Sequence, residues 1–363
     1  MEENRMYVKK LRTFLLCILL MFSLIIPQVV TAATTKNRDE FTKELYNAVT
    51  KRESKVMITY TGKNGDKVFN DFDDLLAAVY QIDDENTSND ADYVQGLLKS
   101  YTVSYNGSLF IIKFQYYESL EETNKVDAEI KKILKSLGVS SMSAYGKAKA
   151  IHDYIIDQVE YDTDLEKFSA YDGLFNNSTV CNGYALLYYK MLTEAGVPCK
   201  IVTGLAEVDG VQTLHAWNIV KLKNKWYLVD PTWDDPIGGT RIYYDYFLKG
   251  SKVFDKEHIA TDQFATEEIL EQYPISEKNY KVTASDIKML SKLSLKVDKS
   301  KKITLPIPEK ASVKWKSSNN KIATVSKTGK ITAKSKGAAT ITATVTMPDK
   351  TVKKLTTKVT VTK

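Results

Sequence analysis

The stretch from residue 181 to residue 230 constrains the fold more than any other part of the chain. Its first part, 181–195, is apolar and aromatic, and Gly196 and Pro198 follow it as a helix stop. Turn signals (Asp209-Gly210 and Lys223-Asn224) then separate three strand-like runs, at 200–206, 212–222 and 225–230. The pattern therefore predicts a buried helix followed by three antiparallel strands.

Cys181 is the first residue of this apolar helix, after the capping run Asn177-Ser178-Thr179. A thiolate is the reactive form of cysteine, and the positive end of a helix favours it. Gly183 lets another chain segment approach, and the following turns should be buried. We therefore expect a nucleophilic thiol. The alternatives are an inert buried cysteine and a Cys181–Cys199 disulfide, since only these two cysteines remain after the export signal described below.

The chain has three histidines, so few residues can serve as the base. His215 interrupts an apolar strand pattern and is the candidate. His152 lies in an amphipathic helix expected at 143–159, beside Asp153, and is read as structural or as a support of the site. His258 lies in a polar stretch and is expected to be exposed.

Strand register selects the acid. With Lys223-Asn224 as a two-residue hairpin loop, Asp230 lies opposite Trp217, and alternation places His215 on the same face, one diagonal away. Diagonal neighbours are about 7–8 Å apart, within reach of a carboxylate and an imidazole. Asp230 would then orient the ring of His215. The alternative is an aspartate that only ends a strand before Pro231.

Several ordered motifs resemble the transglutaminase-like, papain-type cysteine enzymes over residues 143–236. They are Val180-Cys181-Asn182-Gly183-Tyr184-Ala185, Ala195-Gly196-Val197-Pro198, His215-Ala216-Trp217-Asn218 and Trp226-Tyr227-Leu228-Val229-Asp230-Pro231-Thr232-Trp233, with Tyr161-Asp162 and His152-Asp153-Tyr154 upstream. The resemblance implies a papain-like α+β fold with Cys181 as nucleophile, His215 as general base and acid, and Asp230 as its orienter.

The resemblance covers transglutaminases, peptidases and deglycosylating amidases, so it does not choose the reaction. We expect acyl transfer from peptide or side-chain amides through a thioester, with hydrolysis favoured over crosslinking. The alternatives are a protein-glutamine transglutaminase and a non-catalytic surface binding protein. The N–H of Cys181 is one expected oxyanion donor, with Tyr171 or Asn177 as the second. Scarce, widely spaced histidines and cysteines predict no metal, and no cofactor or nucleic-acid motif is present.

The N-terminal residues read as an export signal, 1–33, with a basic start, an apolar run at 14–26 and small residues at the cleavage site. The protein is therefore expected to be secreted and associated with the cell surface or wall, with a membrane contact only if the signal stays uncleaved. Residues 34–138 mix helix and strand, including helices at 39–49, 71–80 and 120–137, a strand at 55–60, an acidic loop at 82–92 and a hairpin at 101–117. They form an α+β region without visible chemistry, before a catalytic domain at 139–278.

The last region, 281–363, changes in character. Short Thr- and Val-rich runs at 303–305, 312–316, 322–326, 330–334 and 339–347 predict an all-β sandwich. The residues Val313-Lys314-Trp315-Lys316-Ser317-Ser318-Asn319, Ala323-Thr324-Val325, Thr328-Gly329-Lys330 and Gly337-Ala338-Ala339-Thr340-Ile341 resemble the bacterial immunoglobulin-like group 2 domain.

Charge divides the chain in the same place. Residues 281–363 hold 20 lysines, no arginine and 4 acidic residues, a net charge of +16, while residues 34–280 carry −12. Lysines at alternating strand positions, such as Lys314 and Lys316 or Lys334 and Lys336, would form a basic face. Such a face attracts anionic cell-wall polymers, teichoic acids for instance. The alternative is that these lysines only keep exposed strand edges soluble.

Overall fold

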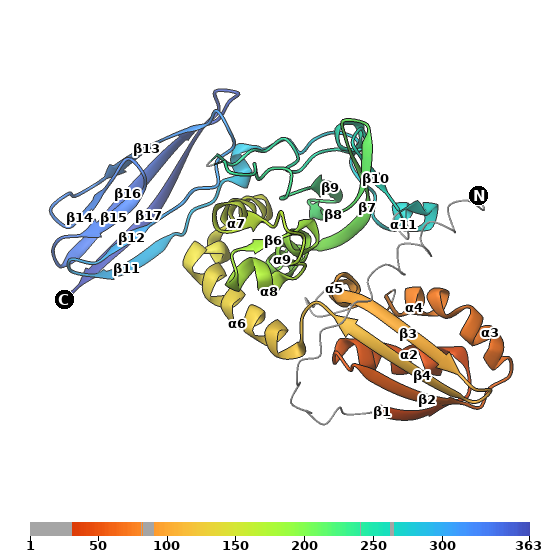
Figure 1. Ribbon diagram of the computed structural model, residues 1–363. Helices are drawn as coiled ribbons and strands as arrows, with labels where there is room; N and C mark the ends of the chain where they lie inside the picture. The colour runs from red at the N-terminus through yellow and green to blue at the C-terminus, as the bar shows by residue number, and fades with distance from the viewer. Residues whose placement is uncertain (1–30, 81, 83–90, 240, 262–264) are drawn as a thin grey trace.

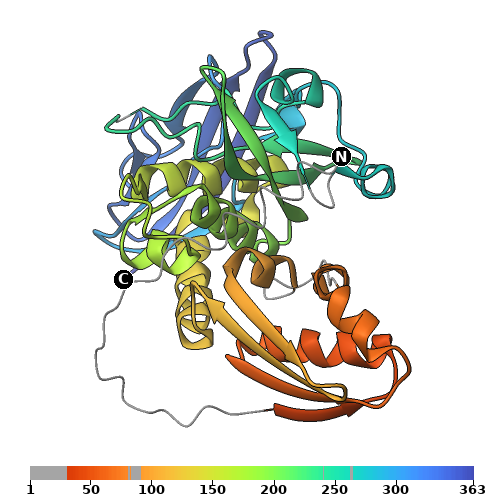
Figure 2. The ribbon, with the colours of Figure 1, turned by 45° about the vertical axis from the view of Figure 1, so that its right-hand side comes forward.

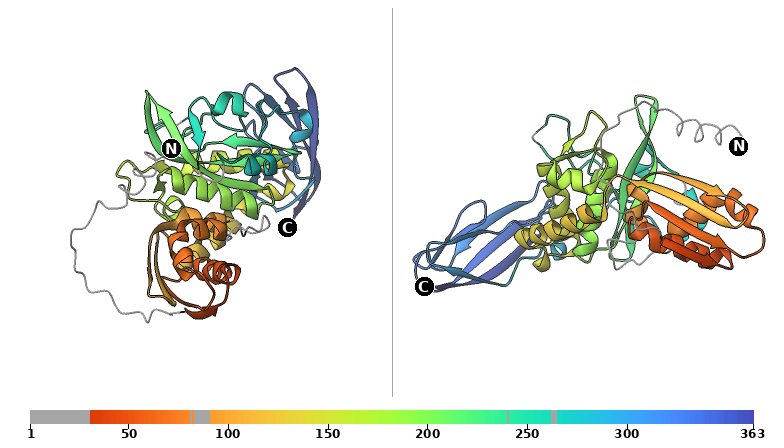
Figure 3. Two further views of the ribbon diagram at one scale, coloured as in Figure 1. Left: turned by 90° about the vertical axis from the view of Figure 1, so that its right-hand side faces the viewer. Right: turned by 60° about the horizontal axis from the view of Figure 1, so that its bottom comes forward.

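A computed structural model describes residues 31–80, 82, 91–239, 241–261 and 265–363. Three regions follow one another in space as they do in sequence, with an N-terminal sheet at one end, a helical core in the middle and a strand-rich region at the other end (Figure 1; Figure 3, right). Residues 1–30 of the expected signal lie outside the described part. Cleavage after Ala33 would leave Thr34 and Thr35 of the first strand.

The N-terminal region is a four-stranded sheet of order β1-β2-β4-β3, with β1 parallel to β2 and the other pairs antiparallel. Helices α2 and α4 cover one face and share one apolar core with it (Figure 2). The elements are β1 (Thr31–Thr35), α2 (Arg38–Thr50), β2 (Lys55–Tyr60), α3 (Gly65–Asn70), α4 (Phe72–Tyr80), α5 (Ala91–Leu97), β3 (Leu98–Tyr105), β4 (Leu109–Tyr116) and α6 (Leu120–Leu137).

Helices α3 and α5 were not predicted. The acidic loop expected at 82–92 lies mainly outside the described residues, and its last two residues begin α5.

The central region places helices on one side of a four-stranded antiparallel sheet of order β10-β7-β8-β9. Its elements are η1 (Val139–Ser141), α7 (Ala144–Gln158), β5 (Glu160–Tyr161), α8 (Ala170–Phe175), β6 (Ser178–Thr179), α9 (Cys181–Glu194), β7 (Cys199–Val208), β8 (Val211–Leu222), β9 (Lys225–Val229), α10 (Ser251–Phe254), β10 (His258–Ala260) and α11 (Glu267–Gln272). The predicted helix and the three strands after it are confirmed. Large apolar side chains on successive turns of α9, such as Leu187 and Met191, are completely buried in the core that α9 shares with the sheet.

The C-terminal region is a two-sheet sandwich with sheets of order β11-β17-β16-β13 and β12-β15-β14. Its elements are η3 (Ala284–Asp286), β11 (Lys292–Lys296), β12 (Ser300–Lys302), β13 (Ser312–Ser317), β14 (Ala323–Val325), β15 (Lys330–Ala333), β16 (Gly337–Thr346) and β17 (Val352–Thr362). The strand expected at 303–305 is wrong, because β12 ends at Lys302, and β11 and β17 were not predicted. Both alternate polar outward residues with apolar inward ones, which is the pattern of a half-buried strand.

The three regions share buried surface. The predicted domain boundary at residue 138 assigns helix α6 to the N-terminal region. Its residues Val126 and Ile130 belong, however, to the same apolar core as α7 and α9. Val345 and Met347 of the sandwich belong to that core as well. The hydroxyl of Ser143, the N-cap of α7, donates to the carbonyl of Asp286. Both neighbours therefore pack directly on the central region.

Candidate active site

Cys181 is the first residue of α9, and its side chain is half-buried. The predicted capping run is wrong in detail, because the N-cap is Val180 and no side chain caps the helix. Ser178 and Thr179 instead form β6, which pairs with β5. The N–H groups of a first helical turn have no acceptor within the helix, so the start of α9 presents donors beside the thiol.

The loop before α9 is held tightly over the helix start. Asp162 Oδ2 accepts the backbone N–H groups of Glu166 at 2.7 Å and Lys167 at 2.9 Å. Gly183 permits this closeness, because a Cβ there would lie 2.7 Å from the carbonyl oxygen of Ser169. The close approach expected at this glycine is confirmed.

Asn182, the residue after the thiol, joins two regions. Its Nδ2 donates to the carbonyl of Phe168 at 2.8 Å and to that of Gly96, on α5, also at 2.8 Å. The N-terminal region thus contacts the start of α9 directly.

The strand register places His215 and Asp230 together. Asn218 pairs with Val229 and Leu222 with Lys225, as the two-residue hairpin predicts. Strand β9 ends at Val229, so the chain leaves the sheet at Asp230 and its carboxylate turns toward β8. His215 Nε2 lies 2.6 Å from Asp230 Oδ2, and Cys181 is a further group that raises the pKa of His215. Since Nε2 faces Asp230, Nδ1 is the ring nitrogen that remains for the sulfur.

Electrostatics favours an ion pair of His215 and Asp230. Burial lowers the pKa of His215, but the charge and hydrogen bond of Asp230, together with Cys181, raise it to about 10. Burial by itself raises the pKa of Asp230, and the charge and hydrogen bond of His215, with help from His258, hold it well below its usual range. Asp230 Oδ1 also accepts the N–H groups of Thr232 at 2.9 Å and Trp233 at 3.2 Å. His215 is therefore an imidazolium at neutral pH.

His258 is not exposed, which corrects the expectation from sequence. It is 2% exposed, and its Nε2 lies 3.0 Å from Asp230 Oδ2. Lys256 and Glu257 beside it are exposed, which explains the polar pattern. Strand β10 carries His258 into the protein by pairing with β7, and this long-range contact leaves no local signal.

His215, Asp230 and His258 offer three potential metal-ligand atoms within 4.8 Å of one another. Both ring nitrogens approach the same carboxylate oxygen at hydrogen-bond distances, 2.6 and 3.0 Å. Two neutral imidazoles and a carboxylate could in principle bind a divalent ion. Here protons on the two rings account for the short contacts, so the donor set is already used within the protein.

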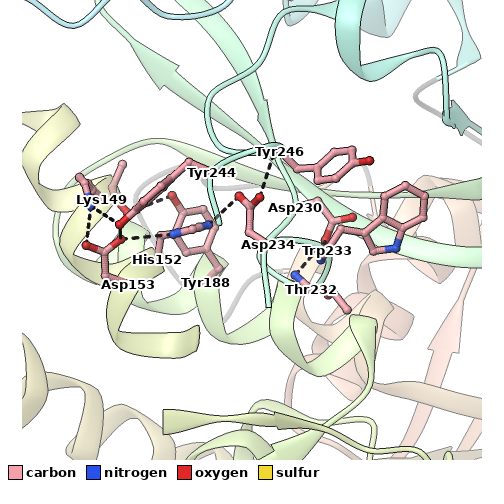
Figure 4. Close-up of polar contacts among 11 residues, drawn as sticks. Lys149, His152, Asp153, Tyr188, Asp230, Thr232, Trp233, Asp234, Tyr244 and Tyr246 are labelled. Carbon is pink, nitrogen blue, oxygen red and sulfur yellow. Dashed lines mark hydrogen bonds and ion pairs between the residues drawn. The ribbon is translucent and has the colours of Figure 1, made fainter. Parts of the chain in front are cut away.

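A second buried network supports the segment after Asp230 (Figure 4). His152, which is completely buried, contacts Asp234 Oδ2 through Nε2 at 3.0 Å, and Asp234 Oδ1 accepts the N–H of Tyr246 at 2.9 Å. On the other side of His152, the Asp153 carboxylate accepts hydrogen bonds from Lys149 and from the hydroxyl of Tyr244. The interpretation of His152 as a supporting residue agrees with this geometry.

The two candidates for the second oxyanion donor, Tyr171 and Asn177, make other contacts. The N–H of Tyr171 donates to Glu118, and its ring stacks on Phe175. Asn177 donates through Nδ2 to the carbonyl of Gln158. These contacts account for both residues without a role at Cys181.

Two aromatic residues of the site lie within the quoted motifs but were given no role. Burial raises the pKa of Tyr161, with a smaller contribution from Cys181. The Trp233 ring lies 5.5 Å from that of His215, centroid to centroid. The sequence signal that could have identified both residues is an aromatic side chain within the same motifs as the candidate residues.

Cys199 is the other cysteine of the described region, and both are free thiols. It is buried at the start of β7, and burial raises its pKa well above the usual value. The disulfide alternative is thereby excluded in this structure, and Cys199 fills core volume.

Two known families match separate parts of the chain. Residues 131–231 match the family model of the transglutaminase-like superfamily, and residues 281–360 match that of the bacterial Ig-like domain (group 2). The chain is 31% identical over 154 residues to the kyphoscoliosis peptidase of Mus musculus, covering 37% of this chain and 23% of that protein. It is 34% identical over 133 residues to the Homo sapiens kyphoscoliosis peptidase, covering 31% and 20%. The chain thus spans less than a quarter of the length of these relatives.

Two solved structures match parts of the chain at low identity. One is described as a candidate cysteine protease from Cytophaga hutchinsonii, with 16% identity, a TM-score of 0.27, and coverage of 45% of this chain and 69% of that one. The other is described as a TGase, with 17% identity, a TM-score of 0.27, and coverage of 55% and 59%. The sequence motifs and the two family models agree, so this chain carries a mixed α/β transglutaminase-like core followed by a bacterial Ig-like domain.

Proposed function

We propose that this protein is a cysteine-dependent enzyme that cleaves peptide or side-chain amides through a thioester on Cys181. The observation that supports it is the 2.6 Å contact between His215 and Asp230, together with the Cys181 thiol at the start of a buried helix. A nucleophile, a base and an orienting group in hydrogen-bonded contact are what covalent acyl transfer requires.

The chemistry balances with these residues alone. The Cys181 sulfur, as thiolate, attacks the amide carbonyl, and the His215 imidazolium gives its proton to the departing amine as the C–N bond breaks. Water then attacks the thioester while His215 takes up its proton, and the carboxylic acid leaves as the thiolate re-forms. Asp230 stays ionised and holds the ring, as the low pKa of its carboxyl indicates. The N–H groups at the start of α9 would stabilise the oxyanion.

Hydrolysis is favoured because water is always present, and because the relatives with matching sequence bear the name peptidase. A protein-glutamine transglutaminase would use the same thioester with an amine as acceptor. A non-catalytic surface protein would not need the ion pair of His215 and Asp230 beside a free thiol.

Product analysis tests the reaction. The protein is incubated with a casein and peptidoglycan mixture in ¹⁸O-water containing a biotinylated primary amine, and the products are analysed by mass spectrometry. A peptidase gives new N-termini and ¹⁸O at the new C-termini. Biotin on glutamine side chains would instead establish transamidation. No product of either kind, together with a Cys181 that reacts with iodoacetamide no faster than free cysteine, would leave only the binding protein.

We further propose that the protein is exported and that the Ig-like domain binds an anionic cell-wall polymer. The outer face of its larger sheet carries exposed lysines on neighbouring strands in register. In one row Lys314 pairs with Thr344, which pairs with Lys354, and in another Lys292 pairs with Lys358. Alternation turns the apolar residues of these strands inward. Lys334 and Lys336 are exposed but lie between β15 and β16, not on a strand.

Salt should release this contact. We expect the full-length protein to co-sediment with isolated bacterial walls at low salt and to dissociate as salt rises past physiological strength, where the screening length is about 8 Å. Walls stripped of teichoic acid should not retain it. The variant Lys314→Glu/Lys354→Glu should bind more weakly than the control Lys334→Glu/Lys336→Glu. The control changes the net charge by the same amount, but at positions outside this face. Binding unchanged by salt and stripping would point to a specific protein or glycan receptor.

No helix in the described ranges is long and apolar enough to cross a membrane. The apolar run of the expected signal precedes those ranges.

A further inference from the structure

His258 has a setting that packing alone does not explain. Its ring is enclosed by aromatic rings, with centroid distances of 4.0 Å to Phe254, 4.4 Å to Trp233 and 5.1 Å to Trp217. Its Nδ1 is buried and has no hydrogen-bond partner in the part of the chain that the structure describes. A buried ring nitrogen without a partner costs free energy that a phenylalanine in the same place would not. The reason that an imidazole occupies this position must therefore lie at its other ring nitrogen, Nε2.

That nitrogen reaches the site across a neighbouring strand. β10 is the edge strand, and β7 separates it from β8, which carries His215. The residues of β7 at this point are small: Ala206 pairs with His258 and Gly204 with His215. A Cβ on Gly204 would lie 2.6 Å from Trp217 Cη2. These two small residues leave the space above β7 in which His258 and Trp217 lie side by side.

Asp230 is the acceptor that His258 contacts. Its Oδ1 accepts two backbone N–H groups, from Thr232 and Trp233, and its Oδ2 lies 2.6 Å from His215 Nε2 and 3.0 Å from His258 Nε2. Because Asp230 is ionised, both ring nitrogens must be protonated donors. A second proton on His258 would sit at Nδ1, where no acceptor is found among the described residues.

We propose that His258 is a positioning residue for the proposed triad, acting through Asp230. Its N–H holds Oδ2 from the side opposite the backbone contacts, so that the carboxylate cannot turn away from His215. It does not itself touch the reacting atoms. This role rests on the proposed function, because it matters only if His215 forms an ion pair with the Cys181 thiolate.

Two variants separate positioning from packing. His258→Phe keeps an aromatic ring in an aromatic enclosure and removes the donor. His258→Gln loses the ring but keeps an N–H donor on a side chain of similar reach. The readout is the rate of Cys181 alkylation by iodoacetamide as a function of pH, measured on the full chain with Cys199→Ala as background, together with thermal unfolding. The other titratable groups near His258 are Asp230, His215, Asp255, Glu257 and Tyr246, all of which are unchanged in both variants.

In His258→Phe we expect alkylation at mildly acidic pH to be roughly tenfold slower or more, the effect of losing one hydrogen bond to a charged group. The pH of half-maximal rate should move upward, since a less firmly held carboxylate stabilises the His215 imidazolium less. His258→Gln should recover most of both effects.

Other outcomes would overturn the inference. If both variants melt earlier but keep the wild-type pH profile, His258 is structural. If the half-maximal pH moves downward in His258→Phe, His258 competes with His215 for Asp230 and does not position it. If the wild-type protein itself shows no fast alkylation at Cys181, the proposed function fails. If the wild type reacts fast and His258→Phe reacts equally fast, only the positioning role of His258 fails.

Discussion

Replacing Cys181 with alanine is expected to reduce amide cleavage by roughly 10⁴- to 10⁶-fold, to the level that substrate binding and the helix amides supply by themselves. Cys199 cannot substitute for it, because Cys199 is buried at the start of β7 and burial raises its pKa. The fold should be retained, since the Cys181 side chain is half-buried at the helix start and contributes little to the core. Cleavage is measured by the appearance of new N-termini under single-turnover conditions.

The matched control is Cys199→Ala, which removes the other thiol of the described region. It should keep activity and lose about 1 kcal/mol of stability, as expected for a small truncation in the core. Native iodoacetamide labelling should modify Cys181 in this variant and nothing in Cys181→Ala. Full activity of Cys181→Ala on an authenticated substrate would remove Cys181 from the mechanism.

Asp230→Asn should lower turnover by roughly 10²- to 10⁴-fold, because an amide oxygen carries no charge and an amide nitrogen facing His215 would force the wrong tautomer. The Asp230 charge is the largest influence that raises the pKa of His215 to about 10, so that pKa must fall in the variant. His215 acts first as an acid. Activity is therefore lost as the pH rises through its pKa, near pH 10 in the wild type and lower in Asp230→Asn.

The same shift has a consequence for stability. The pKa of His215 is higher in the folded protein than its ordinary 6.5, so its pairing with Asp230 stabilises the fold fully below about pH 6.5, and the contribution disappears as the pH rises through about 10. Denaturant unfolding of the wild type should show this decline, and Asp230→Asn should show much less of it. Asp255→Asn, the same substitution at an exposed site near His258, is the control and should behave as wild type. Equal pH profiles in wild type and Asp230→Asn would contradict the ion pair.

The local parts of the site could be predicted from sequence because each depends on short-range rules. The apolar periodicity of 181–195 with its Gly196 stop places Cys181 at a helix start. The two-residue hairpin at Lys223-Asn224 determines the register of β8 and β9, and the register brings Asp230 to His215. Both consequences follow from repeat distances along a helix or a strand pair, without knowledge of the rest of the chain.

The contribution of the N-terminal region to the site could not be predicted in this way. Asn182 bonds to the carbonyl of Gly96, 86 residues earlier in the sequence, and α5, which carries Gly96, begins in a segment that reads as an acidic loop. Similarly, Met347 of the Ig-like domain packs into the central core although the composition of the two regions differs sharply. Propensity and charge describe a segment by itself, whereas these contacts depend on which surfaces meet after folding.

The sequence by itself determined the nucleophile helix, the three antiparallel strands, the pairing of His215 with Asp230 and the change to a β-sandwich near residue 281. Only the tertiary structure decided that His258 is buried against Asp230. A polar segment becomes interior when an edge strand such as β10 adds to the sheet. Two of the rings that enclose His258 there, Trp217 and Trp233, come from distant parts of the sequence. Whether a residue is buried depends on which surfaces meet after folding, so it cannot be predicted from a window of neighbouring residues.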